Sequence, residues 1–550
     1  MFKLYLKFHC GGGNMMGERK FWMMYLHPSD SKEWLSNFNN SELKAYRYFL
    51  CKKGIVGMDV GWDINANCRV HIWGESRGPI FKSFYFDVKK GDIILFNKKC
   101  GNKYVQAILE VLEDKVYIHD KPLPKCQSYS FENDEDKINY SDCLNSLDRI
   151  EITKCMWNKW GIADRNSLNF EEYRYNPKLW FSMIRKVKLL WYLESQTSEF
   201  AELKKYPTTL QPLGEANEHI IKKIKEIISD VTTMEKVKEL ITIMHNTGLN
   251  QIILYGPPGS GKTYFAKKVA EKLIEEPNHE WILNNVVKQK KFKGKGIYKL
   301  IQFHPSYTYE DFIRGIEVKT ENGKPVYQTK NKIFAQMCEI AILNPDKNFV
   351  LIIDEINRAN LPAVLGELIY ALEYRNEEVE IPYEINKSKT LVIPKNLYII
   401  GTMNTADRSA GRIDYAIRRR FIFYPMYADL DKASDEGREL MKLVNEFIEE
   451  KVSPDYDPED VKIGHTYFMA DGNKEERVKT IAHKFLYQVV PLIYEYIVDG
   501  LITADKEKGK GYKLELEDKN FYLRGGKLYD ENGRSVEIEE VIDLIRQWSS

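Results

Sequence analysis

The stretch Gly256-Pro257-Pro258-Gly259-Ser260-Gly261-Lys262-Thr263 decides the fold of the middle of this 550-residue chain. It matches the phosphate-loop pattern G-x-x-x-x-G-K-[ST]. The apolar run at 252–255 predicts a buried strand before it, and apolar residues three and four apart at 266–273 predict a helix after it. Because glycines let the backbone wrap a phosphate chain and helix N-termini bind anions, we predict a nucleotide site. Lys262 would reach the β- and γ-phosphates, and Thr263 would ligate Mg²⁺.

A second apolar run, at 349–353, ends in the acidic pair Asp354 and Glu355. The run does not alternate with polar residues, as expected for a central strand of a parallel sheet that is buried on both faces. We expect Asp354 to hold Mg²⁺ and Glu355 to orient and deprotonate the attacking water. Adjacent acids are common on protein surfaces, so the complete phosphate loop upstream gives this pair its significance.

A third strand-like run, at 397–404, ends in Asn404. An amide at that place could hydrogen-bond the γ-phosphate or the attacking water, the usual role of a sensor residue. A lone Asn after a strand would be a turn residue by default. Its order and spacing relative to the phosphate loop and the acidic pair favour the sensor role.

Three consecutive arginines follow at 418–420, too many to serve one partner. We expect Arg419 and Arg420 to supply the fingers that stabilise charge on a phosphate, across a subunit boundary. As a bare charge run they would be a solvated face. Their place after the other motifs favours the catalytic interpretation.

The pattern along the chain predicts several domains. Strands alternate with helices over 214–425, which predicts an α/β domain with a parallel sheet flanked by helices. Residues 1–150 are aromatic and strand-like and predict a small α+β or β-barrel domain. Residues 151–213 lean towards helix and then become polar, which predicts a helical connector and a linker. Residues 426–550 predict a helical lid and a C-terminal extension.

Two hairpins are expected outside the central domain. Lys90-Gly91-Asp92 predicts a turn into an apolar strand at 93–96, whose partner is the run at 104–109. The pairs Gly525-Gly526 and Asn532-Gly533 predict a hairpin near the C-terminus.

Composition excludes several classes of protein. With 81 basic and 80 acidic residues the net charge is +1, so any basic surface for nucleic acid must be local. The eight cysteines form no C-x-x-C pair, which argues against a zinc site. The sequence has no secretory signal pattern and no apolar stretch long enough to span a bilayer. We therefore expect a cytoplasmic protein with no membrane partner.

These motifs resemble the AAA+ superfamily and, within it, the McrB family. Met403-Asn404-Thr405-Ala406-Asp407-Arg408-Ser409 looks like the M-N-T-A-D-R-S signature of that family. The segments at 302–312, 354–360 and 463–468 agree with it. The resemblance covers roughly residues 215–500 and implies an AAA+ phosphate-loop domain followed by a helical lid.

The resemblance also implies function. It implies a nucleoside triphosphatase that uses GTP rather than ATP, with Mg²⁺, in a homo-hexameric ring. It implies a separate McrC-like subunit that carries the nuclease, and translocation on DNA once a modified base is recognised. Asp407 of the signature is expected to help bind the nucleotide.

The chain itself carries only a superficial nuclease pattern. Pro454-Asp455 and Asp460-Val461-Lys462 echo a P-D…(D/E)-x-K core. The two halves are too close to lie on neighbouring strands, and Pro458 intervenes. We therefore expect the nuclease in a partner protein.

The N-terminal segments at 54–62 and 90–94 weakly resemble PUA-like readers, the EVE and YTH relatives, which bind modified bases. Extruding a base costs a few kcal/mol that stacking on aromatic walls can repay. Trp22, Trp62 and Trp73 are candidates for such a pocket. The alternative is that they are core or rim aromatics of a small barrel. The expected ligand is modified DNA, and RNA is not excluded.

Two other functions remain open at this point. The motor could be an ATP-driven remodelling chaperone, which the signature at 403–409 disfavours. The chain could also be a nucleic-acid-binding regulator that uses slow nucleotide turnover as a switch. A preference for GTP or for ATP would distinguish the restriction motor from the remodelling chaperone. Loss of restriction in a Glu355→Gln variant would exclude the regulator.

Overall fold

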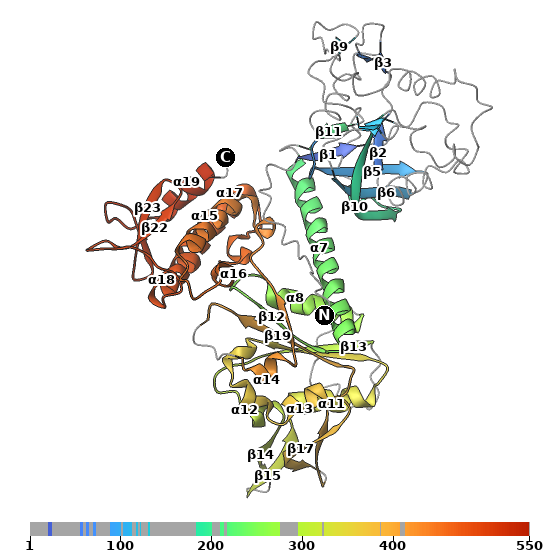
Figure 1. Ribbon diagram of the computed structural model, residues 1–550, viewed down its shortest axis with the longest axis vertical. Helices are drawn as coiled ribbons and strands as arrows, with labels where there is room; N and C mark the ends of the chain where they lie inside the picture. Colours follow the sequence, from blue (N-terminus) through green and yellow to red (C-terminus); the bar gives the residue numbers. More distant parts are fainter. Residues whose placement is uncertain are drawn as a thin grey trace, which may run out of the picture. The chain divides into compact units, whose positions relative to one another are not determined.

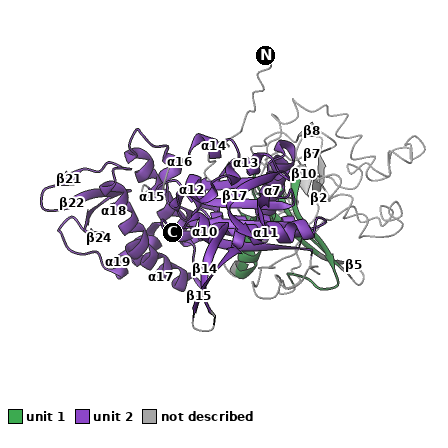
Figure 2. Cartoon of the chain, turned by 90° about the horizontal axis from the view of Figure 1, so that it is seen from below, with its two compact units in different colours: residues 1–232 green, residues 233–550 purple. Residues whose placement is uncertain are grey.

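The computed structural model describes two compact units, residues 1–232 and 233–550 (Figure 2). Helix α7 (Glu218–Thr247) runs across the boundary between them. The described residues are 20–24, 55–58, 62–64, 70–72, 88–100, 103–112, 117–118, 121–122, 130–131, 183–200, 210–213, 217–275, 295–321, 324–385, 387–407 and 413–548.

The second unit is built on a five-stranded parallel sheet (Figure 1). In sheet order its strands are β13 (Gly296–Gln302), β16 (Asn348–Asp354), β19 (Leu397–Asn404), β12 (Gln251–Gly256) and β20 (Ile422–Pro425). The apolar residues of β16 from Phe349 to Ile353 are at most 1% exposed. This burial on both faces explains the unbroken apolar runs, and the predicted α/β fold is confirmed.

Helices cover both faces of this sheet. Helix α8 (Lys262–Ile274) and the C-terminal half of α7 share a core with one face. The other face packs against three helices, α11 (Ile333–Leu343), α12 (Leu361–Leu365) and α13 (Leu368–Glu373). The register aligns the carboxyl ends of the strands, because Gly256 lies opposite Asn404.

Two β-hairpins extend from this domain (Figure 1), and strand β14 of the first one contacts α10 (Tyr309–Phe312). They are β14–β15 (Arg314–Glu321 and Lys324–Asn331) and β17–β18 (Glu378–Ile385 and Ser388–Val392). Arg314, only 4% exposed, joins them by donating to the carbonyls of Tyr383 and Ser388.

The lid follows β20. It contains α15 (Asp435–Lys451), α16 (Pro458–Val461), the 3-10 turn η8 (His465–Phe468), α17 (Lys474–Lys484), the π-turn η9 (Phe485–Val489) and α18 (Val490–Val498). The C-terminal extension adds a four-stranded antiparallel sheet and a helix. They are β21 (Lys506–Glu507), β22 (Gly511–Leu516), β23 (Lys519–Arg524), β24 (Lys527–Tyr529) and α19 (Ile538–Trp548).

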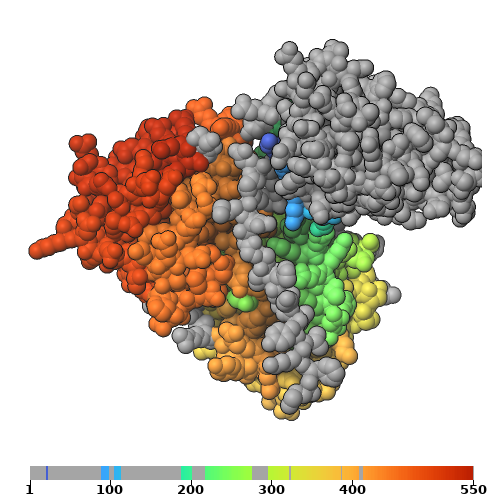
Figure 3. Space-filling model, turned by 45° about the horizontal axis from the view of Figure 1, so that its top comes forward, coloured from blue at the N-terminus to red at the C-terminus, as the bar shows by residue number. Residues whose placement is uncertain are grey.

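Lid and extension share one hydrophobic core. Leu514, Leu523 and Ile545 of the extension are fully buried in it together with Leu440 and Ile481 of the lid. In space filling the two form a continuous surface (Figure 3). The predicted hairpin is confirmed, because Gly525 and Gly526 join β23 to β24 with φ of +57° and +73°.

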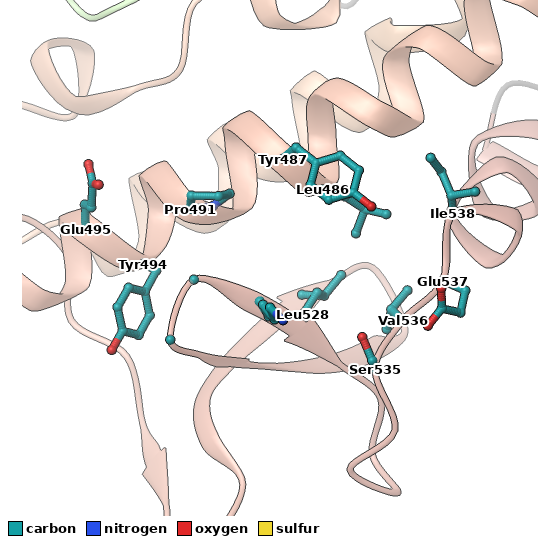
Figure 4. Close-up of a pocket in the computed structure, with 13 residues that line it drawn as sticks. Leu486, Tyr487, Pro491, Tyr494, Glu495, Leu528, Ser535, Val536, Glu537 and Ile538 are labelled. Atoms are coloured by element: carbon teal, nitrogen blue, oxygen red, sulfur yellow. The ribbon is translucent and has the colours of Figure 1, made fainter.

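A groove with a volume of about 630 Å³ lies between the lid and the extension (Figure 4). Its described lining comes from η9, α18, β24 and the segment that leads into α19. Tyr487 and Pro491 line one side, and Leu528 and Val536 line the other.

In the first unit the described strands form an eight-stranded sheet and a separate three-stranded sheet. The larger sheet contains β1 (Phe21–Met24), β2 (Ile55–Met58), β5 (Ile93–Cys100), β6 (Lys103–Val111), β7 (Tyr117–Ile118), β8 (Lys121–Pro122), β10 (Met183–Ser195) and β11 (Leu210–Pro212). The smaller sheet contains β3 (Trp62–Ile64), β4 (Val70–Ile72) and β9 (Ser130–Phe131). The predicted hairpin is confirmed as β5–β6.

Within the range 151–213, the prediction of helix is wrong for residues 183–195. Residues 183–195 form the long strand β10, which pairs with β6 from Val187 opposite Val111 to Ser195 opposite Tyr104. The short-range pattern of this segment suited a helix, but pairing with a strand far away in the sequence decided its structure. The PUA-like assignment stays a prediction.

No helix in the described ranges is both long and apolar enough to cross a bilayer.

The lid docks on the phosphate loop through backbone hydrogen bonds. Gly464 N–H donates to the Pro258 carbonyl at 2.9 Å, and Thr466 N–H donates to the Gly259 carbonyl at 3.1 Å. A Cβ on Gly464 would overlap the Gly259 carbonyl and the Ser260 nitrogen. Since the φ of Gly464 is −71°, which any residue adopts, close packing alone requires glycine there.

We therefore expect Gly464→Ala to push the lid off the phosphate loop. Overpacking of this kind costs about 1–3 kcal/mol, which a lowered thermal midpoint would report. Nucleotide affinity should fall about tenfold, which corresponds to about 1.4 kcal/mol. Gly500→Ala is the control, because Gly500 has φ +69° but no atom within 4 Å of an added Cβ. It should lose stability without losing affinity. Wild-type affinity in Gly464→Ala would contradict the docking.

Candidate nucleotide site

The phosphate loop has the backbone that its glycines predict. Gly259 and Gly261 have φ of +74° and +84°, in the left-handed region where a side chain would be strained. Helix α8 begins directly after Gly261, so its first N–H groups lie at the loop. An N-terminus of this kind binds phosphate oxygens.

Lys262 is held inside this loop. It is 7% exposed, and its ammonium donates to the carbonyls of Gly256 at 3.0 Å and Pro257 at 2.7 Å. Burial lowers the pKa of Lys262 to about 8, although Glu355 and Asp354 act in the opposite direction. A nucleotide phosphate at the loop would supply the close anionic partner that favours the charged form.

Asp354, Thr263 and Thr402 meet at the end of β16. The hydroxyls of Thr263 and Thr402 donate to the same oxygen of Asp354, at 2.8 Å and 2.5 Å. Hydroxyl and carboxylate oxygens are the ligands that Mg²⁺ prefers, and in such sites phosphate oxygens and water complete the shell. The pair Thr263 and Asp354 therefore fits the predicted magnesium site.

Neighbouring residues contact both the backbone and the carboxylate of Glu355. Its backbone adopts φ +53°, which is costly for a residue with a side chain, and its N–H donates to the Thr402 hydroxyl at 3.2 Å. One carboxylate oxygen accepts from the Asn404 amide at 2.6 Å. The other lies 3.4 Å from the Arg358 guanidinium. A strained backbone held by several contacts is typical of functional sites.

The environment of Glu355 suits a general base. Burial raises the pKa of its carboxyl group, and Asp354 adds to this shift, whereas Arg358 opposes it. A carboxylate whose pKa moves towards neutral pH is a stronger base than one at the surface. The sequence-based roles of Glu355 and Asn404 are thus compatible with a geometry that joins the two side chains directly.

Sequence analysis missed two residues of this site, Thr402 and Arg358. Thr402 lies two positions before Asn404 in β19, and side chains two apart in a strand point to the same face. Arg358 ends the 3-10 turn η6 (Ile356–Arg358), three positions after Glu355. Both spacings were readable signals.

Asp407 lies beside Arg358, with 3.2 Å between a carboxylate oxygen and a guanidinium nitrogen. The arginine therefore bridges the signature segment and Glu355. The direct role in nucleotide binding expected for Asp407 stays a prediction.

The three arginines have different environments. Arg419 is 65% exposed and lies 3.4 Å from Glu373. Arg420 is buried, pairs with Glu373 at 2.9 Å and donates to the Ala416 carbonyl at 2.7 Å. Arg418, the last residue of α14 (Tyr415–Arg418), stacks on Phe423. The finger role predicted for Arg420 disagrees with a side chain engaged inside its own subunit, whereas Arg419 is accessible.

The predicted base pocket is only partly within the described residues. Trp22 is 3% exposed, and its indole N–H donates to Asp92, itself 4% exposed, at 2.8 Å. This arrangement is that of a core aromatic with a satisfied polar end. The side chain of Trp62 and the whole of Trp73 lie outside the described residues, so the pocket stays a prediction.

The two halves of the nuclease-like pattern lie in the lid. Asp460 belongs to the short helix α16, and Lys462 forms ion pairs with Glu449 at 3.0 Å and with Glu459. These residues lie in one loop and one helical turn, not on paired strands.

Comparisons with known proteins agree with this geometry. Residues 251–421 match the model of the AAA domain of the dynein-related subfamily, and residues 436–507 match that of the McrB α-helical lid domain. The solved structure of PCH-2 from C. elegans is 15% identical, covering 58% of this chain and 68% of that one. Its TM-score is 0.24, and the likeness carries no argument.

Two curated relatives take part in restriction. The EcoKMcrB subunit of the type IV methyl-directed restriction enzyme of Escherichia coli K12 is 33% identical over 308 residues, 52% of this chain and 61% of the relative. The YdiS component of the type II restriction enzyme BsuMI of Bacillus subtilis 168 is 27% identical over 236 residues, 36% of this chain and 62% of the relative. The matches thus span less than two thirds of either relative.

Three observations lead to one assignment. Asn404 lies opposite the phosphate loop and bonds Glu355 of the acidic pair, the sheet matches an AAA domain, and the lid matches the McrB lid domain. From its nucleotide-binding core to its lid, this chain has an AAA domain followed by an McrB-type α-helical lid, and both are similar to the McrB family of AAA+ proteins.

Proposed function

We propose that this chain hydrolyses GTP as the motor subunit of a modification-dependent restriction complex. The observation that carries the proposal is the hydrogen bond from Asn404 to Glu355 at 2.6 Å, next to the contact of Thr263 with Asp354 at 2.8 Å. These two contacts support our assignment of Glu355 as the general base, Asn404 as the sensor, and Thr263 and Asp354 as the magnesium ligands, all at one end of a parallel sheet. That place is where ligands bind in such folds.

Each group then has a task in phosphoryl transfer to water. The N–H groups at the start of α8 and the Lys262 ammonium hold the phosphate chain. Magnesium bound by Thr263 and Asp354 would neutralise charge on the β- and γ-phosphates. Glu355 takes a proton from the attacking water, while Asn404 fixes the carboxylate. The water oxygen attacks the γ-phosphorus, and the nucleoside diphosphate leaves.

The site needs a further positive charge on the γ-phosphate. Arg418 and Arg419 are both exposed, but the Arg418 guanidinium lies over the Phe423 ring at 4.9 Å. We therefore assign Arg419 to the site of a neighbouring copy in a homo-hexameric ring. Arg420 instead anchors the segment that carries Arg419, because Gln251 also donates to the Arg420 carbonyl at 2.6 Å.

The proposed use of GTP comes from the resemblance to the McrB family, and the proposed role in restriction comes from the relatives. The Escherichia coli relative is named as a subunit of a methyl-directed restriction enzyme. By extension, the N-terminal unit of this chain would read modified DNA, and nucleotide hydrolysis would drive translocation. A partner subunit of the McrC kind would cut the DNA, and the complex would work in the cytoplasm.

The proposal is tested by steady-state hydrolysis of GTP and ATP measured side by side with the full chain. We expect GTP to be preferred at least tenfold in kcat/KM, with Glu355→Gln as the inactive reference. A preference for ATP would leave the hydrolytic site standing but would contradict the restriction motor and favour an ATP-driven remodelling function.

Removal of the proposed finger makes a second test. Arg419→Ala should bind nucleotide and melt within about 0.5 kcal/mol of wild type, because the side chain is exposed. Its turnover should fall about 10³-fold, as for other arginine fingers. Arg420→Ala should instead lower stability by about 2 kcal/mol, because it removes a buried guanidinium together with its ion pair to Glu373 and its hydrogen bond to the Ala416 carbonyl.

Mixing two inactive variants tests action between subunits. In a mixture of Arg419→Ala and Glu355→Gln chains, some sites combine the intact Glu355 of one subunit with the intact Arg419 of its neighbour. We expect the mixture to regain hydrolysis. A mixture as inactive as its components, or normal turnover in Arg419→Ala alone, would contradict the assignment.

A further inference from the structure

Residues 404–407, at the end of β19 and directly after it, contact Glu355, Arg358, the lid and the phosphate loop. Asn404 holds Glu355, and Asp407 lies against Arg358. Between them, Ala406 is 8% exposed and belongs to the hydrophobic core of the lid, not to the core of the sheet. Asn404, which holds the Glu355 carboxylate, is therefore only two positions from Ala406, which lies in the lid core.

Thr405 is the residue that makes this crossing. Its backbone N–H donates to the carbonyl of Gly256, the first residue of the phosphate loop, at 3.1 Å. Its hydroxyl donates to the carbonyl of Asp460 in the lid helix α16 at 2.6 Å. One residue thus bonds the phosphate loop with its backbone and the lid with its side chain.

The acceptor in the lid is itself held firmly. Helix α16 begins at Pro458 and is capped by Asp457, whose carboxylate accepts from the Glu459 N–H at 2.9 Å. Val461, the next residue after the acceptor, is fully buried in the lid core. A displacement of the lid would therefore carry the Asp460 carbonyl with it.

Two backbone hydrogen bonds also join the lid to the phosphate loop, from Gly464 to Pro258 and from Thr466 to Gly259. They fix the lid to the loop but do not reach the acidic pair. The Thr405 hydroxyl adds a contact one residue away from Asn404, whose amide holds Glu355 at 2.6 Å.

We propose that Thr405 is a positioning residue that couples the docked lid to the catalytic carboxylate. When the lid is docked on the phosphate loop, the bond from Thr405 to α16 fixes the end of β19, and Asn404 holds Glu355 in place. When the lid lifts for nucleotide exchange, this bond breaks and Glu355 loses its fixed position. Hydrolysis is thereby limited to the state with the lid closed. The inference rests on the proposed hydrolytic function.

Thr405→Val tests it, because valine keeps the shape of threonine and lacks the hydroxyl. A half-buried hydrogen bond such as this one is worth enough to change an equilibrium up to about tenfold. We expect kcat, measured at saturating nucleotide, to fall about tenfold. The amide protons of Gly464 and Thr466 should exchange about tenfold faster in the nucleotide-free chain, a readout that needs no activity. Thr405→Ser, which retains the hydroxyl, should restore both.

A matched control exists in the lid. The Thr503 hydroxyl also donates to a backbone carbonyl, that of Lys451 at 3.1 Å, but Thr503 is exposed and its hydrogen bonds go to Lys451, not to the phosphate loop. Thr503→Val should change neither turnover nor exchange. If Thr405→Val does not fold, Thr405→Ala loses the same hydroxyl without leaving a methyl group against the carbonyl.

Three results would overturn the proposal. The first is wild-type turnover in Thr405→Val, and the second is failure of Thr405→Ser to restore turnover. The last is that Thr405→Val lowers turnover by the same factor in an Asn404→Ala chain as in the wild-type chain. The last result would mean that Thr405 does not act through Asn404. Failure of the proposed function would give a different result. The wild-type chain would then hydrolyse nucleotide no faster than Glu355→Gln, whereas amide exchange at Gly464 and Thr466 would still report the contact between Thr405 and the lid.

Discussion

The position of β19 between β12 and β16 is the constraint on which the rest of the site depends. In a parallel sheet the carboxyl ends of neighbouring strands lie together, so the residue that ends the middle strand reaches both neighbours. Asn404 lies opposite Gly256 of the phosphate loop on one side and donates to Glu355 on the other. Since this register is set by buried apolar pairs such as Ile352 with Ile400, the catalytic geometry is a consequence of the core.

The site contains features that cost stability, and the surrounding structure holds them in place. Glu355 has a left-handed backbone and a carboxylate that is only 17% exposed, and Lys262 is a buried ammonium. Strain of this kind costs about 1–3 kcal/mol and persists only where neighbours fix it. Thr402, Asn404 and Arg358 fix Glu355, and the lid covers the phosphate loop from the other side. His465 contributes as a buried imidazole beside Gly261, and burial lowers its pKa to about 4, so it packs there as a neutral ring.

Sequence reasoning succeeded where local pattern and global fold agree. The phosphate loop, the strands β12, β16 and β19 and the acidic pair follow from apolar runs that end in polar residues. It failed where the decision lay in distant pairing. The strand β10 leaned towards helix locally, and β6, more than seventy residues earlier, made it a strand. Arg419 and Arg420 both lie near Glu373, yet the first is 65% exposed and the second 8% exposed, a difference that no spacing in the sequence predicts. The bond from Thr405 to the Asp460 carbonyl involves a backbone acceptor 55 residues away, which leaves no signal in the sequence.

The most direct measurement of the central claim is a structure of the full chain carrying Glu355→Gln, solved with GTP and Mg²⁺. The account predicts the phosphate chain at the start of α8, the metal between Thr263 and Asp354, and the Asn404 amide beside residue 355 and the γ-phosphate. It also predicts Thr405 bonded to the Asp460 carbonyl with the lid closed. A nucleotide bound elsewhere, or bound at the loop with residue 355 turned away from the γ-phosphate, would contradict it.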